Sequence, residues 1–339
     1  MKILVVKRDK IGDLLLTTPL FAHLKQSRPD AELHLLATSY NAWVARGNPD
    51  IDRLWVYRRV REGGRLDVAA ALQALPLRSR LRRERFDWVL VGNGDESERA
   101  VRWGLAARGA RTVAYVKDAA RYPGLSDPLV LTPGVHEMDR LLALLVPMGI
   151  PIPKDPPWPR YELPAADAAV AQDWLKSHGL KDGNYVALGL GARRIKKQPI
   201  AEQVLRWSTH FKTAWNLDTV FMWTPGKSDD PNYPGDDAAA EPVLAAKPAW
   251  LHPFRGPIPQ ALGLIWSART SLFPDSGLMH FAAASPGGVL GFFAEADVSP
   301  APSQWAPRGP KADWLEAAKS VAELADELVY ERVARLVSR

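Results

Sequence analysis

Residues 3 to 20 read ILVVKRDKIGDLLLTTPL, an apolar run followed by a charged turn and a second apolar stretch. The aliphatic run from Ile3 to Val6 favours a buried strand, and the leucines after Gly12 recur with helical spacing. Short β-branched runs alternate with longer helical patterns along the rest of the chain. This alternation is typical of βαβ units around a parallel sheet, so we expect an α/β fold.

A proline-rich segment divides the chain. Residues 147–164 read PMGIPIPKDPPWPRYELP, and their seven prolines exclude a helix and favour a stiff, extended connection. We predict a Rossmann-like, doubly wound domain over 1–150, a linker over 151–164 and a second such domain over 165–312. Because ligands bind beyond the carboxyl ends of the strands in such sheets, we expect the two domains to face each other across a cleft that holds the site.

The composition excludes several classes of site. The chain has no cysteine, which removes disulfides, thiolate metal sites and cysteine nucleophiles and fits a reducing compartment. The seven histidines show no paired metal-binding spacing, so we predict no metal. The N-terminal apolar run is too short for a signal sequence and no long apolar span follows, so we expect a cytoplasmic protein.

The positive charge is concentrated in the first half of the chain. Residues 1–150 contain 24 Lys and Arg against 17 Asp and Glu, whereas residues 151–339 contain 20 against 21. Arginines dominate the excess in two groups: Arg58, Arg59, Arg61 and Arg65, and then Arg78, Arg80, Arg82, Arg83 and Arg85. Arginine suits phosphate and carboxylate partners, so the pattern favours an anionic lipid, a membrane surface or nucleic acid. A solvated helix face explains the second group equally well.

The stretch GLGARRIKKQP, residues 189 to 199, follows a predicted strand and precedes a predicted helix. Gly189 and Gly191 would let backbone amides approach a phosphate, and Lys196 or Lys197 would supply a point charge to a diphosphate. The stretch lacks the third glycine of a dinucleotide fingerprint and the Ser or Thr of a Walker motif. An ordinary basic loop is the alternative.

The stretch FPDSGLMHFAAA, residues 273 to 284, has the outline of an anion site. A strand ends near Phe273, and the backbone amides of Gly277, Leu278 and Met279 would point out of a helix N-terminus that favours negative charge. In the alternative interpretation, Asp275 or Ser276 only caps the helix. An acid beside a phosphate is unfavourable unless it binds hydroxyl groups, so Asp275 suits a sugar.

Asp13 has two interpretations from the residues alone. It stands at the start of a helix, directly after Gly12, where a capping acid is common. It also follows the first predicted strand, at the edge of the sheet where a ligand would bind, and an acid there could remove a proton from a hydroxyl group.

Taken in order, these motifs resemble the bacterial heptosyltransferases of glycosyltransferase family nine, which transfer heptose from ADP-heptose to lipopolysaccharide and have a GT-B fold. The resemblance covers nearly the whole chain. Besides the three stretches above, it rests on HEMDRLLALLVPMGI at residue 136, PGGVLGFF after the third stretch, and WAPRGP at residue 305.

The resemblance implies roles for individual residues. It makes Asp13 the catalytic base, Lys196 a ligand of the donor diphosphate and Asp275 a contact to the donor sugar. It also implies that the helix start formed by Gly277 to His280 binds the phosphate. It implies an acceptor in the first domain, where we assign Gly12, Arg58, Arg59 and Arg61, and it implies that a C-terminal helix, residues 313–339, packs on that domain. Two departures are Gln198, where the family usually has an aromatic residue, and Ser276 in place of threonine.

The resulting prediction is an inverting, metal-independent glycosyltransferase without a cofactor, acting on a nucleotide sugar and an anionic glycolipid. The predicted partners include the inner face of the inner membrane as a peripheral contact and exclude nucleic acid. One alternative is an epimerase or hydrolase of nucleotide sugars, which would need a second acid–base group beside Asp13. Another is a non-catalytic protein that binds a nucleotide sugar or a lipid.

Overall fold

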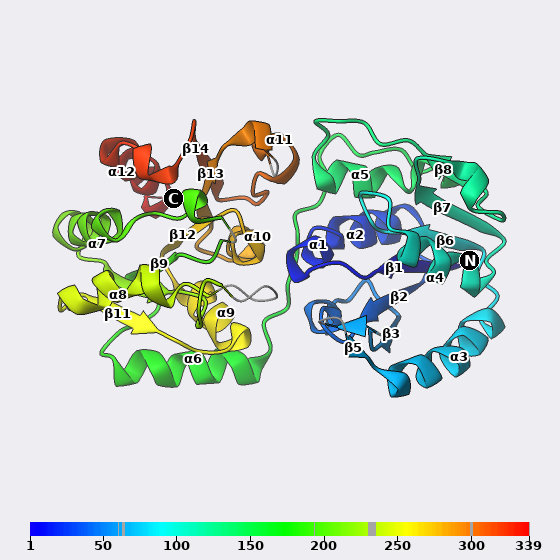
Figure 1. Cartoon of the computed structure of the whole chain (residues 1–339), viewed down its shortest axis with the longest axis horizontal. Coiled ribbons are helices and arrows are strands. Elements are labelled where there is room, and N and C mark those ends of the chain that lie inside the picture. Colours follow the sequence, from blue (N-terminus) through cyan, green and yellow to red (C-terminus); the bar gives the residue numbers. More distant parts are fainter. Residues whose placement is uncertain (60, 63–64, 193, 230–234, 299–300, 339) are drawn as a thin grey trace. The chain divides into compact units, whose positions relative to one another are not determined.

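The computed structural model describes residues 1–59, 61–62, 65–192, 194–229, 235–298 and 301–338. These residues form two compact units, Met1–Glu162 and Leu163–Arg339. The division falls inside the proline-rich segment, where residues 151–164 form neither helix nor strand. Each unit contains a six-stranded sheet with helices packed against it (Figure 1).

All six strands of the first unit's sheet are parallel, in the order β3-β2-β1-β6-β7-β8. Their bounds are β1 Lys2–Lys7, β2 Glu32–Thr38, β3 Arg53–Tyr57, β6 Trp88–Val91, β7 Arg111–Tyr115 and β8 Asp127–Leu129. A small hairpin consists of β4 Arg61–Glu62 and β5 Arg65–Leu66. The α-helices are α1 Ile11–Leu15, α2 Thr18–Ser27, α3 Val68–Arg83, α4 Glu98–Ala107 and α5 Glu137–Ala143, and the 3₁₀ helices are η1 Ala42–Ala45, η2 Ala119–Arg121 and η3 Val146–Met148.

The core of the first unit follows from the alternation of side chains along β1. Leu4 and Val6 pack in one cluster with apolar residues of α3 and α4. Ile3 and Val5 are also fully buried and point to the opposite face, because successive side chains of a strand alternate. Both faces of β1 are therefore covered, as parallel sheets require.

The second unit repeats this arrangement in the order β11-β10-β9-β12-β13-β14, again with parallel pairs. Its strands are β9 Tyr185–Gly189, β10 Asp218–Met222, β11 Leu251–Phe254, β12 Thr270–Pro274, β13 Val289–Ala294 and β14 Ala312–Ala317. The α-helices are α6 Ala165–Ser177, α7 Ala201–Trp215, α8 Asp237–Ala246, α9 Ile258–Ser267, α10 Gly277–Ala284, α11 Pro302–Trp305 and α12 Asp326–Val337, and the 3₁₀ helices are η4 Ile195–Lys197, η5 Ala296–Val298 and η6 Val321–Glu323. The prediction of two doubly wound α/β units is confirmed.

The prediction of a single C-terminal helix over 313–339 is wrong in its bounds, and its packing on the first domain stays a prediction. Residues 312–317 form strand β14, in which the buried Leu315 and Ala317 alternate with exposed residues at the period of a strand. The helix begins only at Asp326, and its apolar face, Val329 and Val333 included, is buried in the core of the second unit.

The helical pattern that follows Gly12 forms two helices, α1 and α2, rather than one. Pro19 has no backbone N–H to donate to Leu15, so a continuous helix would leave that carbonyl without a partner. Instead the Thr18 hydroxyl donates to Leu15 O over 2.8 Å, and the Thr17 hydroxyl donates to Asp13 O over 2.8 Å. The break keeps α1 short, with Asp13 in its only full turn.

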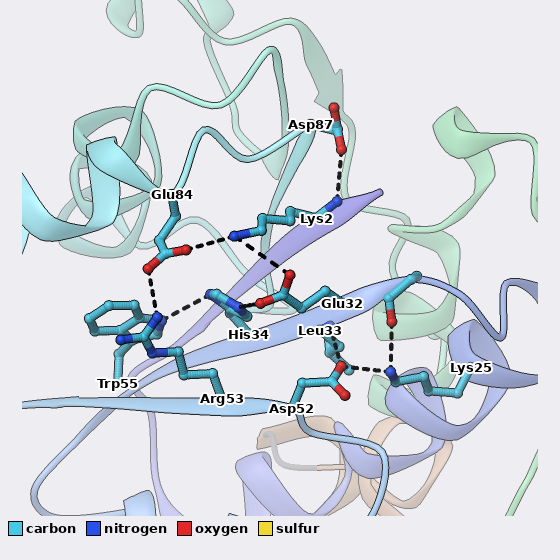
Figure 2. A network of polar contacts seen from close by, with 11 residues as sticks. Lys2, Lys25, Glu32, Leu33, His34, Asp52, Arg53, Trp55, Glu84 and Asp87 are labelled. Carbon is cyan, nitrogen blue, oxygen red and sulfur yellow. Dashed lines mark hydrogen bonds and ion pairs between the residues drawn. The ribbon is translucent and has the colours of Figure 1, made fainter.

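The amino ends of three strands of the first sheet are joined by a polar network (Figure 2). Lys2 Nζ donates to Glu84 Oε2 over 2.8 Å and lies 3.5 Å from Glu32 Oε2. Glu32 Oε1 lies 2.8 Å from His34 Nε2, and His34 Nδ1 accepts a hydrogen bond from Trp55 Nε1 over 3.1 Å. The network ties β1, β2 and β3 together at the edge opposite the carboxyl ends.

Glu32, His34 and Glu84 are close enough to suggest a metal site, but their bonding favours a structural role. They form the one such group among the described residues. Because Trp55 donates to His34 Nδ1, the neutral imidazole carries its proton on Nε2, the atom that would have to face a metal ion. The Lys2 ammonium already occupies the space between the two carboxylates.

Within the described part of the chain, no helix combines the length and the apolar character needed to cross a bilayer.

We predict that Glu84→Gln lowers the melting temperature at pH 7 by about 2–4 °C. The hydrogen bond from Lys2, aided by the charge of Arg53, holds the pKa of Glu84 below its ordinary value of 4.5. A carboxyl group with a lowered pKa stabilises the fold above that ordinary value, and the contribution disappears as the pH falls through the folded pKa. Thermal unfolding followed from pH 7 to pH 3 should show the two proteins converging. A gap that stays constant over this range would contradict the account.

Candidate active site

Lys7, the last residue of β1, places a fully buried ammonium group at the carboxyl end of the first sheet. Its Nζ donates to Gly92 O over 2.6 Å and lies 3.1 Å from Asp9 Oδ2 and 4.0 Å from Glu137 Oε1. Burial alone would lower the pKa of Lys7, but the charges of the surrounding carboxylates raise it above its ordinary value. Lys7 therefore stays charged and gathers acids around it.

Asp13 is one of these acids, and it is half-buried in the first turn of α1. Its Oδ2 accepts the backbone N–H of Lys10 over 3.0 Å, so Asp13 does help to cap the helix. Burial raises the pKa of Asp13 to about 6; Lys7 and the Lys10 amide oppose the rise, whereas Asp9 and Glu137 add to it. A carboxylate with this pKa is ionised at neutral pH and is a stronger base than an ordinary aspartate. The capping and base interpretations are compatible.

The other acids of this cluster are held in place by the neighbouring strand ends. Asn93, which follows β6, donates a hydrogen bond to Asp9 Oδ1, and Asn41 donates to Asp9 O over 3.2 Å. Glu137 is buried at the start of α5, and a side chain at Gly94 would overlap its carboxylate. Gly94 is therefore required for Glu137 to approach Lys7.

Two of the predicted acceptor residues lie beside the loop that joins β1 to α1. Gly12 is buried in α1, directly before Asp13. Arg59 is half-buried, and its Nη2 donates to Arg8 O over 3.1 Å. Arg59 therefore supports the backbone of the loop that leads into α1 and Asp13.

The structure does not bring Arg58 to this loop, and the side chain of Arg61 lies outside the described residues. Arg58 is exposed and pairs with Asp67 over 2.9 Å. The assignment of Arg58 to the acceptor site stays a prediction. An anionic acceptor would have to replace the ion pair between Arg58 and Asp67.

In the second unit, the predicted anion site at the start of α10 has the expected backbone geometry. Ser276 is the N-cap residue and has extended backbone angles, but its side chain makes no capping hydrogen bond. Its Oγ is shielded from solvent and has no hydrogen-bond partner among the described residues. The first-turn amides of Gly277, Leu278 and Met279 are therefore not satisfied by the cap. Met279 and His280 have buried side chains, so α10 offers its amides rather than these side chains.

The two neighbouring lysines of η4 have different surroundings. Lys197 is buried, and its Nζ donates to Asp275 Oδ2 over 2.8 Å. The side chain of Lys196 is 56% exposed and pairs with Glu295 Oε1 over 2.6 Å. The acid predicted to contact the donor sugar therefore already has a buried cationic partner, whereas the lysine predicted to hold the diphosphate has an ammonium group that can move.

Gln198, the departure from the family pattern, anchors the loop that carries these lysines. Its Nε2 donates to Ala192 O over 2.9 Å and to Asp236 Oδ1 over 2.6 Å. Gly191 lies in the same loop, partly exposed, where an added Cβ would be 3.4 Å from Thr224 Oγ1. Hydrogen bonds of Gln198 thus hold this loop in place, at the position where the family usually has an aromatic side chain.

Sequence reasoning missed several residues of both half-sites: Lys7, Asp9, Asn93, Glu137, Lys197 as the partner of Asp275, and Asp236. Lys7, Asp9 and Asn93 had a signal that could have found them, since each stands at or just after the carboxyl end of a strand of one sheet. Asp236 had none, because it reaches Gln198 from a segment distant in sequence. Glu137 stands in the motif HEMDRLLALLVPMGI, but nothing in the sequence indicated its approach to Lys7.

No protein-family model matches the chain. A curated protein of Haemophilus influenzae, described as "Putative glycosyltransferase", is 45% identical over 53 residues, which are 16% of this chain and 15% of that protein. The matched part is thus a small fraction of both proteins.

Solved structures match the chain over its whole length. The glycosyl transferase family 9 protein of Veillonella parvula superposes with a TM-score of 0.81 over 99% of this chain and 97% of its own, at 18% identity. The E. coli ADP-heptose LPS heptosyltransferase II gives 0.75 over 100% and 99%, at 19% identity. E. coli heptosyltransferase WaaC with ADP gives 0.75 over 99% and 100%, at 15% identity.

The chain has the GT-B fold of glycosyltransferase family 9. At these identities the likeness establishes the fold, and it confirms the resemblance that the ordered motifs indicated.

Glu137→Gln should lower the pKa of Asp13, because a negative charge that raises it is removed while Lys7 remains. If Asp13 acts as a base, activity requires its ionised form, so the decline of kcat/KM at acid pH should move to lower pH. Glu137→Asp, which keeps the charge, is the matched control and should keep the limb near pH 6. If the decline of kcat/KM at acid pH does not shift in Glu137→Gln, the charge of Glu137 does not raise the pKa of Asp13.

The two lysines of η4 should respond differently to replacement by methionine. Lys197→Met leaves Asp275 without its buried partner and should destabilise the protein by about 3–5 kcal/mol, measured by urea denaturation. Lys196→Met removes only a partly exposed ion pair and should change stability by less than about 1 kcal/mol. Its effect should appear instead as weaker binding of a nucleoside diphosphate by calorimetry. A large loss of stability in Lys196→Met, with weaker nucleotide binding in Lys197→Met, would contradict these roles of the two lysines.

Proposed function

We propose that the protein is an inverting glycosyltransferase that moves a heptose, or a related sugar, from a nucleoside diphosphate to a hydroxyl group of an anionic glycolipid. The observation that carries this proposal is Asp13, a partly exposed carboxylate whose pKa is raised to about 6 by burial and by its acidic neighbours. A helix cap needs none of these features, whereas a base does.

In the proposed reaction, Asp13 takes the proton of the acceptor hydroxyl as the hydroxyl oxygen attacks the anomeric carbon of the donor. The bond from that carbon to the diphosphate oxygen breaks, and the electron pair leaves with the diphosphate. Attack opposite the leaving group inverts the anomeric centre. The proton ends on the Asp13 carboxyl group, which releases it to solvent.

The second unit supplies groups suited to the leaving diphosphate. The uncapped amides at the start of α10 favour an anion, and the exposed Lys196 ammonium can leave Glu295 for a phosphate oxygen. Asp275, fixed by Lys197, accepts hydrogen bonds from sugar hydroxyl groups. In this proposal these groups meet the growing negative charge, so the reaction needs neither a metal ion nor another cofactor.

The names of the relatives suggest the substrates. One E. coli protein of this fold is named as an ADP-heptose LPS heptosyltransferase, and another was solved with ADP. We therefore propose ADP-heptose as the donor and a lipopolysaccharide core acceptor. The excess of positive charge in residues 1–150 is consistent with an anionic acceptor on the first unit.

We predict that the protein converts ADP-heptose and a truncated lipopolysaccharide to a product heavier by one heptose, detected by mass spectrometry. Asp13→Asn keeps the hydrogen-bond acceptor of the helix cap but cannot take a proton, so kcat should fall by about 10²–10⁴-fold. Donor affinity should be retained. The melting temperature at pH 7 should also be retained, because asparagine keeps the capping acceptor and replaces a half-buried charge with a neutral group.

The same assay separates the alternatives. A hydrolase would release ADP without acceptor, an epimerase would change the donor sugar without acceptor, and a binding protein would leave both substrates intact. Near-normal turnover by a folded Asp13→Asn protein would return Asp13 to the role of a cap and contradict the proposed mechanism.

A further inference from the structure

The outer face of α3 carries an apolar stripe that no described part of the chain covers. Val68, Leu72 and Leu75 are 60%, 67% and 65% exposed. Leu72 and Leu75 are the two most exposed leucines among the described residues. The opposite face of the helix packs in the core of the first unit through Ala74, Leu77 and Leu81. The stripe is therefore not the face that holds α3 in the fold.

The same outer face becomes basic toward the end of the helix. Successive steps of four, three and seven residues lead from Val68 through Leu72 and Leu75 to Arg82, and a helix places residues at such steps on one side. Arg82 and Arg83 are exposed. Arg83 makes no hydrogen bond or ion pair with another described residue. The face thus has an apolar half and a cationic half.

Acidic side chains do not neutralise this face. The helix contains four arginines and no acid. Asp67, at its N-cap, accepts the Ala70 amide over 2.9 Å and pairs with Arg58. Glu84, directly after the helix, pairs with Lys2 and Arg53. Both flanking acids are therefore engaged by other cations or by the helix itself.

The combination of properties selects among the possible occupants. A second copy that docked the same face would bring two cationic helices together, which is unfavourable. Nucleic acid offers phosphates to the arginines but no apolar phase to the leucines. An anionic bilayer offers both, because acyl chains lie directly beneath the phosphate groups.

We propose that α3 docks the first unit on an anionic lipid bilayer, with Val68, Leu72 and Leu75 at the acyl boundary and Arg82 and Arg83 at the phosphates. The inference deepens the proposed function, since a glycolipid acceptor lies in such a surface. It is tested without turnover, so its failure and the failure of the proposed transfer can be distinguished.

The test is sedimentation of the full chain with vesicles of phosphatidylglycerol and phosphatidylcholine, against vesicles of phosphatidylcholine alone. We expect binding to the anionic vesicles that weakens as salt is added. Leu72→Gln/Leu75→Gln should weaken it by at least about tenfold. Arg82→Gln/Arg83→Gln should weaken it by about 30-fold at low salt, since each cation near such a surface contributes about 1 kcal/mol.

Matched controls remove equivalent groups elsewhere on the first unit. Val130→Gln/Val146→Gln removes two exposed apolar side chains, and Arg28→Gln/Arg99→Gln removes two exposed arginines. Both controls should bind within about twofold of the wild type. All variants should keep a melting temperature close to that of the wild type, because every changed side chain is exposed and Arg82 loses only an exposed hydrogen bond to Ala106 O. No binding to anionic vesicles, or equal losses in the controls, would overturn the proposal. So would a dimer of the wild type that Leu72→Gln/Leu75→Gln dissociates, since α3 would then be a contact between copies.

Discussion

The buried ammonium group of Lys7 is the interaction on which the first unit's site depends. A lone charge in this position would be strongly unfavourable, so the fold must supply compensating groups, and it does so with Gly92 O, Asp9 and Glu137. These acids in turn surround Asp13 and, together with burial, raise its pKa to about 6. The buried cation thus explains why Asp9 and Glu137 gather near Asp13. Their charges add to the rise in its pKa that burial causes, whereas Lys7 itself opposes that rise.

The second unit also contains a buried lysine paired with a carboxylate. Lys197 and Asp275 form a buried ion pair, which fixes the acid beside the start of α10. Its neighbour Lys196 is exposed and pairs with Glu295, so one of the two adjacent lysines positions an acid inside the unit and the other faces solvent. Each unit therefore has a buried lysine that orients carboxylates at the carboxyl ends of its strands. In the proposed function the first unit serves the acceptor and the second serves the donor.

The α/β class and most strands could be predicted from sequence because alternating apolar runs reflect local periodicity. The C-terminal prediction failed because Leu315 and Ala317 fit either a helix or a strand, and only pairing with β13 decides between them. The positions of Asp13 and Asp275 after the ends of β1 and β12 could be predicted, because both residues stand in recognisable motifs. Glu137 could not, since it lies 130 residues from Lys7 in sequence and meets it only where Gly94 leaves space.

The central claim is that this buried network makes Asp13 a base, and it can be tested directly by titrating the Asp13 carboxyl group. Carbon-13 labelling of the aspartates, with the Asp13→Asn spectrum used to assign the signal, would report its protonation by NMR from pH 3 to pH 8. The account predicts a midpoint of about 6. A midpoint near the ordinary aspartate value of 3.8 would contradict it, because Asp13 would then be no stronger a base than an aspartate in water.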